Sequence, residues 1–321
     1  MMQLTSACDI FDNYATTFAL SEEDCAEFLV LVQDVSHPVD GMMAVSGLTL
    51  SMLEDGWNEG RMKLLLKAYL ESPVEEVRER SLVGLLLVML MHNAMLRECQ
   101  HLWEPIQEVL TSDAELTFTA LCNIARTAQV KKLELFNQQL AKDIMPLMDK
   151  VGSDEFYEVI RKHQDDMERI ARMHLDQNFL IFKSAYQTPF FQQRAAHWFL
   201  PWNDEHLLSI AEEERQQVQD MLSVWQMCDS DKYAFLGMSN MIRNTMKGQL
   251  QSDLLGQMGE SLGHMNIVTN GYVQQLYRFF RLSSFARVLP FDLVNYMRQT
   301  LAFRWIVVGE RARTAIGQFL S

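Results

Sequence analysis

The chain has 321 residues, which is long enough to fold around a hydrophobic core without metal or disulfide cross-links. Hydrophobic residues make up 48% and charged residues 22%, and this balance excludes a disordered chain. The 14 Gly and 7 Pro are too few for a turn-rich β architecture, so we expect an all-α protein. The net charge of −14 disfavours broad attraction to nucleic acid or to an anionic membrane.

Cysteine usage and the amino-terminal sequence indicate the cellular compartment. The five cysteines include no CxxC pair, so they encode neither a disulfide framework nor a four-cysteine zinc site. No Lys or Arg precedes the first apolar residues, unlike in a secretory signal, and we expect a cytoplasmic protein with reduced thiols. The longest apolar run, 82–91, is about half of the roughly 20 residues that span a bilayer. It predicts a buried helix and no membrane insertion.

An internal repeat predicts the architecture of residues 1–150. A small residue followed by Leu opens an apolar helical segment three times, at spacings of 37 and 36 residues: Gly47-Leu48, Gly84-Leu85 and Ala120-Leu121. Further helices are predicted between and after these segments, over about 58–70, 98–110 and 131–148. In an α-solenoid, a small residue on the inner helix lets its partner approach closely, and stacked helix pairs bury their apolar faces against one another.

The middle unit has a recognisable pattern. A proline ends one helix, and the next begins with a Val-Arg pair followed by small residues at a three-residue step: Pro73, Val77, Arg78, Ser81 and Gly84. This pattern resembles the inner helix of a HEAT repeat, in which the small residues are usually Ala. The resemblance covers about 40–150 and implies a HEAT-like α-solenoid of antiparallel helix pairs. An irregular helical bundle is the alternative.

Short stretches spread along the chain point to a wider group of proteins. They are 48–51, 80–84, 189–191, 197–202, 230–233 and 276–280. Together they resemble uncharacterised bacterial proteins that combine HEAT-like helices with tetratricopeptide repeats. The resemblance implies a bacterial helical-repeat protein but no particular activity. A tetratricopeptide array is not recognisable after residue 280.

The repeat fades after residue 150, and we expect residues 151–321 to form a less regular helical region rich in aromatic residues and Met. An amphipathic helix is predicted over 154–175 and a long helix with an acidic outer face over 204–228. Between them, Pro189 and Pro201 limit the chain to a helix of about ten residues.

Aromatic side chains are dense between these two prolines. They either fill a junction between packed helices, which is the favoured interpretation, or present anchors to a partner protein. The candidate partner-binding residues are Phe190, Phe191, His197, Trp198 and Trp202.

The carboxyl-terminal segment 272–321 is basic, with seven Arg, no Lys and two acidic residues. Its charge of +5 leaves −19 for the preceding residues, which together make the total of −14. Arg among aromatics can bind phosphates and stack on unpaired bases. The candidate nucleic-acid-binding residues are Tyr277, Arg278, Phe280, Arg281 and Arg287. The favoured interpretation is that this segment packs as helices against the acidic remainder of the chain.

Several motifs suggest chemistry but lack the context that the chemistry needs. The GxSxG pattern at 259–263 is not preceded by a β-branched strand, as a nucleophile elbow would be. Glu98 and His101 have the ExxH spacing of a metal-binding helix, but a di-iron bundle needs two such pairs. Asp34 and His37 come near that spacing, but Pro38 follows them directly.

Two further sets of charged residues have simpler interpretations. His163, Asp166 and His174 share a helical face that is equally typical of a charged surface. Asp229 and Asp231 lack the Gly and Glu of a calcium loop, and an N-cap for a helix starting near residue 232 is the preferred interpretation.

The function that these observations favour is binding. We expect a non-enzymatic scaffold or adaptor that binds another protein through its helical-repeat surface and segment 190–202, with no cofactor, metal or small-molecule substrate. The alternative is an RNA-associated protein that uses the Arg and aromatic segment. A hydrolase or metal enzyme with an unrecognised site is the third hypothesis.

Overall fold

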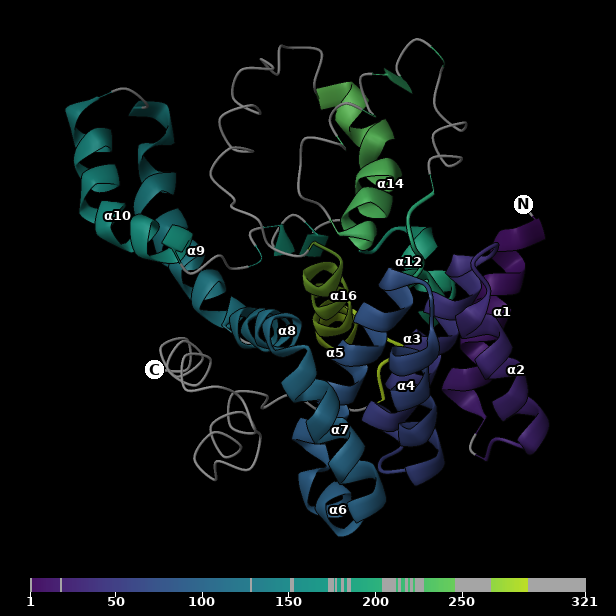
Figure 1. The fold of residues 1–321 in the computed structure, drawn as a ribbon. Helices are drawn as coiled ribbons and strands as arrows, with labels where there is room; N and C mark the ends of the chain where they lie inside the picture. Colours follow the sequence, from purple (N-terminus) through teal and green to yellow (C-terminus); the bar gives the residue numbers. More distant parts are fainter. Residues whose placement is uncertain are drawn as a thin grey trace.

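The computed structural model describes most of the chain and confirms the all-α class (Figure 1). The described residues are 2–17, 19–127, 129–150, 153–172, 176, 178–179, 182–183, 186–203, 212, 215–216, 219, 222, 228–245 and 267–287. They contain helices and no strand. None of the described helices has the length and hydrophobicity needed to cross a membrane.

The chain begins with two helices that the repeat pattern does not predict, α1 (Met2–Thr16) and α2 (Glu22–Gln33). Ser21 and Asp24 form a capping box at the start of α2, because each side chain accepts a hydrogen bond from the other residue's backbone N–H. Tyr14 of α1 donates to the carbonyl of Asp24, and its ring meets the ring of Phe28 edge-on. These local contacts fix α2 against α1.

The predicted helices of the first half are present. Asn58 caps one of them by accepting a hydrogen bond from the backbone N–H of Arg61, and the helix ends at Ser72, just before Pro73. The apolar run 82–91 lies in a helix that is buried along most of its length, as predicted. The elements are α3 (Pro38–Glu54), α4 (Glu59–Glu71), α5 (Glu75–Met91), α6 (Asn93–Glu98), α7 (Gln100–Ser112), α8 (Ala114–Thr127), α9 (Val130–Ile144) and the 3₁₀ helix η1 (Met145–Lys150).

Two of the predicted small residues sit where helices approach closely. A Cβ at Gly47 of α3 would overlap the carbonyl oxygen of Phe11 in α1. A Cβ at Gly84 of α5 would lie 2.5 Å from the hydroxyl oxygen of Thr49 in α3. The close approach predicted at these two glycines is therefore present, since a Cβ at either position would require its neighbour to move.

The second half contains long helices and two short helical segments. α10 (Asp154–Arg172) confirms the predicted amphipathic helix and packs on α9, and the two form an arm that projects from the other helices (Figure 1). The remaining elements are α12 (Pro189–Gln193), η2 (Ala195–Trp198), α14 (Asp229–Thr245) and α16 (Ile267–Leu282).

Two predicted elements differ from the structure. The ten-residue helix after Pro189 is wrong, because the backbone becomes extended at Arg194 and divides it into α12 and η2. The helix expected from residue 232 begins at Asp229 instead. Most of the helix predicted over 204–228, and the whole of 259–263, lie outside the described residues.

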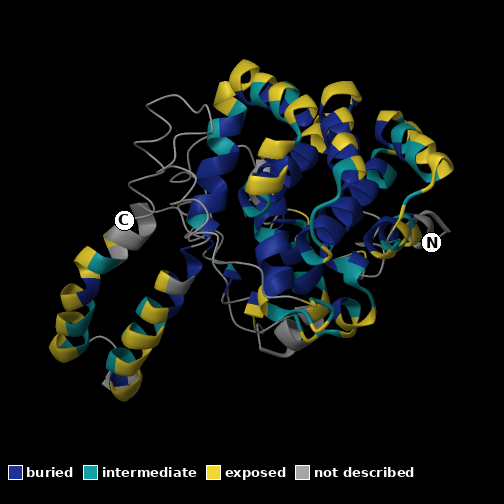
Figure 2. Ribbon diagram, turned by 90° about the horizontal axis from the view of Figure 1, so that it is seen from below, coloured by how far each residue is buried: buried dark blue, intermediate teal, exposed yellow. Residues whose placement is uncertain are grey.

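One hydrophobic core crosses the expected boundary at residue 150. α16 lies against α5 and α8, and η2 lies against α1 and α16. Most described residues of α16 are buried, and the helix lies among α5, α8 and α3 (Figure 1), while buried residues gather in the interior of the molecule (Figure 2). Phe191, Trp198, Phe199 and Phe279 belong to the same buried cluster as the core residues of α3 and α5. The two halves therefore share a core.

Candidate functional site

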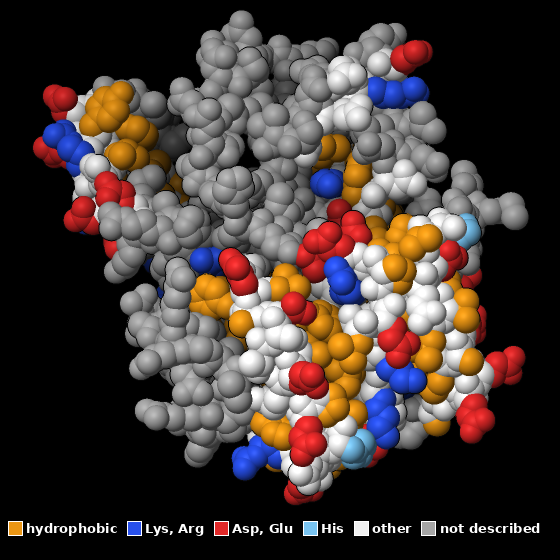
Figure 3. Space-filling view, viewed as in Figure 1, with side chains coloured by type: hydrophobic (Ala, Val, Ile, Leu, Met, Phe, Trp, Pro, Cys, Tyr) orange, Lys and Arg blue, Asp and Glu red, His pale blue; other side chains and the backbone are white. Residues whose placement is uncertain are grey.

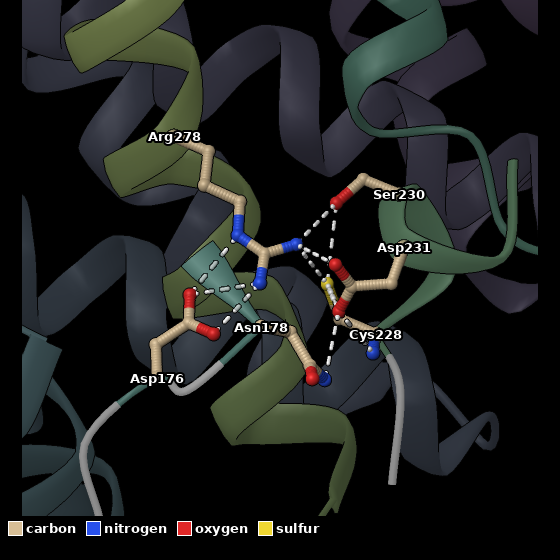
Figure 4. Close-up of polar contacts among 6 residues, drawn as sticks. All are labelled: Asp176, Asn178, Cys228, Ser230, Asp231 and Arg278. Carbon is tan, nitrogen blue, oxygen red and sulfur yellow. Dashed lines mark hydrogen bonds and ion pairs between the residues drawn. The ribbon is translucent and has the colours of Figure 1, made fainter. Parts of the chain in front are cut away.

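A buried arginine joins α14 and α16 to an aspartate that is distant in the sequence. Arg278 of α16 has no exposed surface (Figure 4). Its Nε and Nη2 donate to the carboxylate of Asp176 at 3.0 and 2.8 Å, and its Nη1 donates to Asp231 of α14 at 2.6 Å. Such charge-assisted, bidentate contacts are the strong ones among protein hydrogen bonds.

The start of α14 completes this cluster. Nη1 of Arg278 also lies 3.2 Å from the Ser230 hydroxyl and 3.0 Å from the Cys228 sulfur. The carboxylate of Asp231 accepts the backbone N–H of Cys228 at 3.3 Å and its thiol at 3.2 Å. Asp231 thus caps its own helix and at the same time binds Arg278. We call Asp176, Cys228, Ser230, Asp231 and Arg278 the arginine hub.

Burial controls the protonation of the hub. It raises the pKa of the Asp176 carboxyl, although the charge of Arg278 opposes this. It also raises the pKa of the Cys228 thiol well above its ordinary value, so this cysteine is protonated and a weak nucleophile. Burial acts to lower the pKa of Arg278, but the two aspartates outweigh it and raise that pKa. The hub is suited to holding helices together.

A second buried arginine reaches the same end of α14. Nη1 of Arg80 in α5 donates to the Ser46 hydroxyl and to the Phe199 carbonyl, both at 2.9 Å. Its guanidinium lies over the ring of Tyr272, 4.9 Å from the centroid, and 3.8 Å from Asp229. Two arginines from α5 and α16 therefore position the first turn of α14.

Two of the predicted partner-binding residues are in the core. Phe191 has no exposed surface and Trp198 is 1% exposed. The indole N–H of Trp198 donates to the Phe191 carbonyl at 3.0 Å, and its ring meets those of Phe182 and Phe279. Core filling, the favoured interpretation, is confirmed for these two side chains, so neither presents a surface to a partner.

The other three predicted residues, Phe190, His197 and Trp202, are partly exposed, and we call them the aromatic edge. Phe190 is stacked between the rings of His197 and Tyr233, with centroids 4.4 and 4.5 Å away. Trp202 meets Tyr233 at 5.0 Å in an edge-to-face arrangement. Tyr233 of α14 is buried and donates its hydroxyl to the Pro201 carbonyl at 2.9 Å. The four rings form one continuous series of contacts, two stacked and one edge-to-face.

The protonation of His197 follows from its contacts. Its Nδ1 lies 2.6 Å from the Phe190 carbonyl, an acceptor, so Nδ1 carries the proton. Burial lowers the pKa of His197, and the hydrogen bond to Phe190 only partly offsets this. The imidazole is therefore neutral at pH 7, and Nε2 is an acceptor.

Arg194 fastens the aromatic segment to the first helix. Its Nη2 pairs with Asp9 at 2.7 Å and also with Asp12, to which its Nε donates at 3.1 Å. These side chains are partly exposed, so the pairs set geometry more than stability. They explain why the helix breaks at Arg194, whose extended backbone aims the side chain at α1.

The predicted nucleic-acid-binding residues are mostly unavailable. Tyr277, Arg278 and Phe280 are buried, which does not fit contact with phosphates or unpaired bases. Arg281 lies 3.7 Å from Glu134, and Arg287 lies 3.0 Å from Glu54. The favoured interpretation, that this segment packs against acidic residues, is confirmed for these three arginines.

The suggested metal motifs do not assemble. Nε2 of His101 lies 3.0 Å from Glu59 rather than pairing with Glu98, and His163 lies 2.8 Å from Asp143. His37 lies 2.9 Å from Asp34 directly before α3. In the part of the chain that the structure describes, no group of three or more His, Cys, Asp or Glu could hold a metal ion. His174 lies outside that part.

Sequence reasoning missed the hub and the Arg80 contacts. Asp176, Cys228 and Arg80 carry no motif, and the only signal was the run of polar residues 229–231 at a helix start. Comparisons with protein-family models, with curated proteins and with solved structures find no match for this chain.

Proposed function

We propose that this protein is a non-enzymatic scaffold or adaptor that binds another protein through the aromatic edge. The observation that carries the proposal is that His197 and Trp202 keep part of their rings exposed while the rings beneath them are packed. Aromatic side chains supply much of the energy at protein interfaces, particularly when they are held in position before binding.

The side chains of the aromatic edge have little conformational freedom to lose on binding. Phe190 is stacked on both faces, and the Tyr233 hydroxyl is hydrogen-bonded. Arg194 fixes the segment to α1, and Trp198 anchors it in the core. A partner that contacts Trp202 and His197 therefore pays a small entropic cost.

The helical-repeat part of the proposal rests on helix order. α3 lies against α5 and α5 against α8, while α2 lies against α4 and α4 against α7. This order is the one expected of stacked helix pairs and supports a HEAT-like solenoid as in bacterial repeat proteins. α16 covers α5 and α8, so the proposal assigns the partner contact to the aromatic edge instead of an inner groove. The five free cysteines agree with a cytoplasmic location.

A capture experiment with matched variants tests the proposal. The tagged wild-type chain, a His197→Ala/Trp202→Ala variant and a Tyr157→Ala variant are used to capture proteins from a native-host lysate, with and without nuclease. Tyr157 is 52% exposed on the α9–α10 arm and is the control for removing a surface aromatic. Circular dichroism and thermal melting confirm that each variant is folded.

The expected result is a protein that the wild type and Tyr157→Ala capture, that the double variant loses, and that nuclease does not release. Its affinity is then measured with purified components. If the double variant binds that protein as tightly as the wild type, the aromatic edge is not the contact. If capture depends on nucleic acid, the RNA-associated alternative replaces the proposal.

A further inference from the structure

The arginine hub has more buried negative charge than positive charge. Asp176 is 4% exposed and Asp231 6%, while Arg278 has no exposure. Both carboxylates bind the same guanidinium, and the Cys228 thiol is neutral. With both aspartates ionised, the hub would carry a net charge of about −1, given one cation and two carboxylates.

The surrounding charged groups are already engaged elsewhere. Tyr277 on α16 faces Asp176 but is itself next to Arg281 and Glu134, which lie 3.7 Å from each other. On the side of α14, Asp229 lies 3.8 Å from Arg80 and 3.7 Å from Lys232. Among the described residues, Arg278 is the cation that contacts both hub aspartates.

An excess charge inside a protein is costly, and proteins relieve it by binding a proton. Two carboxylates that share a site do not ionise independently, so a proton taken up there belongs to the pair. The raised pKa of Asp176, caused mainly by burial, agrees with this.

We propose that the arginine hub is a proton-responsive clamp, in which Asp176, which shares one guanidinium with Asp231, takes up a proton and thereby holds the start of α14 most firmly against α16. The proton binds to a carboxylate oxygen of Asp176, and Arg278 keeps its charge. The protonated hub is neutral overall. Loss of the proton restores the excess negative charge and weakens the clamp.

The direction of the pH effect follows from linkage. Because the hub binds its proton more tightly in the folded chain than in the unfolded chain, its contribution is fully present below the unfolded carboxyl pKa. The contribution is lost as the pH rises through the folded pKa. Unfolded aspartate has a pKa of about 3.9, so the window begins there and extends towards neutral pH.

The clamp has a structural consequence two residues further along α14. Tyr233 follows Asp231 closely and lies under Phe190 and Trp202. A looser first turn of α14 would disturb the ring on which the aromatic edge is stacked. The inference concerns the fold itself and holds whether or not the edge binds a partner.

The test compares the pH dependence of unfolding in the full chain and in Asp231→Asn, which removes one negative charge from the hub. Urea unfolding is measured between pH 4 and 7. The expected result is that the unfolding constant of the wild type, divided by that of the variant, rises with pH. The rise is tenfold for each unit by which folding raises the pKa of the pair.

Asp143→Asn is the control, because the hydrogen bond from His163 lowers the pKa of Asp143 and gives the opposite sign. The same ratio for this variant should stay nearly constant between pH 4 and 7, because the contribution of Asp143 is already complete above the unfolded carboxyl pKa of about 3.9. A ratio for Asp231→Asn that is constant or falls with pH overturns the proposal.

A second measurement covers the case in which Asp231→Asn does not fold. The carboxyl carbons of Asp176 and Asp231 are followed by NMR in the wild-type chain during a pH titration. Protonation of the pair above the ordinary aspartate range supports the clamp. If both carboxyl groups titrate at or below that range, the clamp does not exist.

Discussion

Gly47 of α3 lies directly against the carbonyl oxygen of Phe11 in α1, so closely that a Cβ at position 47 would overlap that oxygen. The contact explains how α1 packs closely on α3. A similar close contact joins α3 and α5, where Gly84 lies against the side chain of Thr49. At Gly47 a Cβ would meet the backbone of α1, and at Gly84 it would meet the side chain of Thr49.

Gly47→Ala should therefore destabilise the protein, because the backbone of α1 has to move to make room. We expect a loss of at least about 1–3 kcal/mol in the free energy of unfolding, the usual cost of overpacking a core. Gly60→Ala is the matched control, since Gly60 is exposed in the first turn of α4 and Ala favours a helix. Urea unfolding of both variants measures the effect. Equal stabilities would show that α1 does not pack this closely on α3.

Arg278→Met should be among the most destabilising changes in the chain, because it leaves Asp176 and Asp231 buried without their cation. Breaking a buried pair in this way costs about 3–5 kcal/mol. Arg278→Lys should recover only part of the loss, since an ammonium group cannot contact both oxygens of Asp176 in the same geometry.

The control for Arg278 is Arg281→Gln on the same helix. Arg281 is 44% exposed and lies 3.7 Å from Glu134, so we expect a change below about 1 kcal/mol. The measurement is again the free energy of unfolding from urea titrations. A loss of similar size in the two variants would mean that the hub does not hold α14 and α16 together.

The first-half helices could be predicted because their signals are local. Asn58 caps α4 three residues from the N–H that it accepts, and Pro73 stops the same helix. The spacing of 36 and 37 residues singled out Gly47 and Gly84, and in the structure each lies in a close contact with a neighbouring helix. Helix caps and the spacing of small residues depend on residues close together in the sequence, so they can be recognised without the structure.

The hub could not be predicted, because its partners are far apart in the sequence. Arg278 and Asp176 are 102 positions apart, and nothing in the charge pattern selects Asp176 among 42 acidic residues. The prediction for the aromatic segment was wrong for a different reason. The predicted helix is broken at Arg194, Trp198 of η2 enters the core, and Trp202, which lies beyond Pro201, is only partly buried.

The contact between the two helices of the arm should weaken in acid. Asp143 of α9 lies 2.8 Å from His163 and 3.4 Å from Lys162 of α10, and the hydrogen bond from His163 lowers the pKa of Asp143. This contribution is present above the unfolded carboxyl pKa of about 3.9 and is lost as the pH falls through the folded value. The protection of the α10 amides against hydrogen exchange, corrected for the intrinsic pH dependence of exchange, should therefore fall below about pH 4.

Asp143→Asn gives the comparison for the arm. The variant should show lower protection of the α10 amides at pH 6 and little further loss of protection on acidification, since the charged partner of His163 is already gone. If acid lowers the protection of the α10 amides equally in the wild type and the variant, the effect belongs to other groups.

The two tryptophans of the aromatic segment should differ in fluorescence. Trp198 is 1% exposed and is surrounded by the rings of Phe182, Phe191 and Phe279, so its emission should be blue-shifted and resistant to iodide. Trp202 is partly exposed and should be quenched more readily. The difference between the wild-type spectrum and those of Trp198→Phe and Trp202→Phe isolates each contribution among the six tryptophans. Stronger quenching of the Trp198 component would place that ring at the surface and return it to the candidate interface.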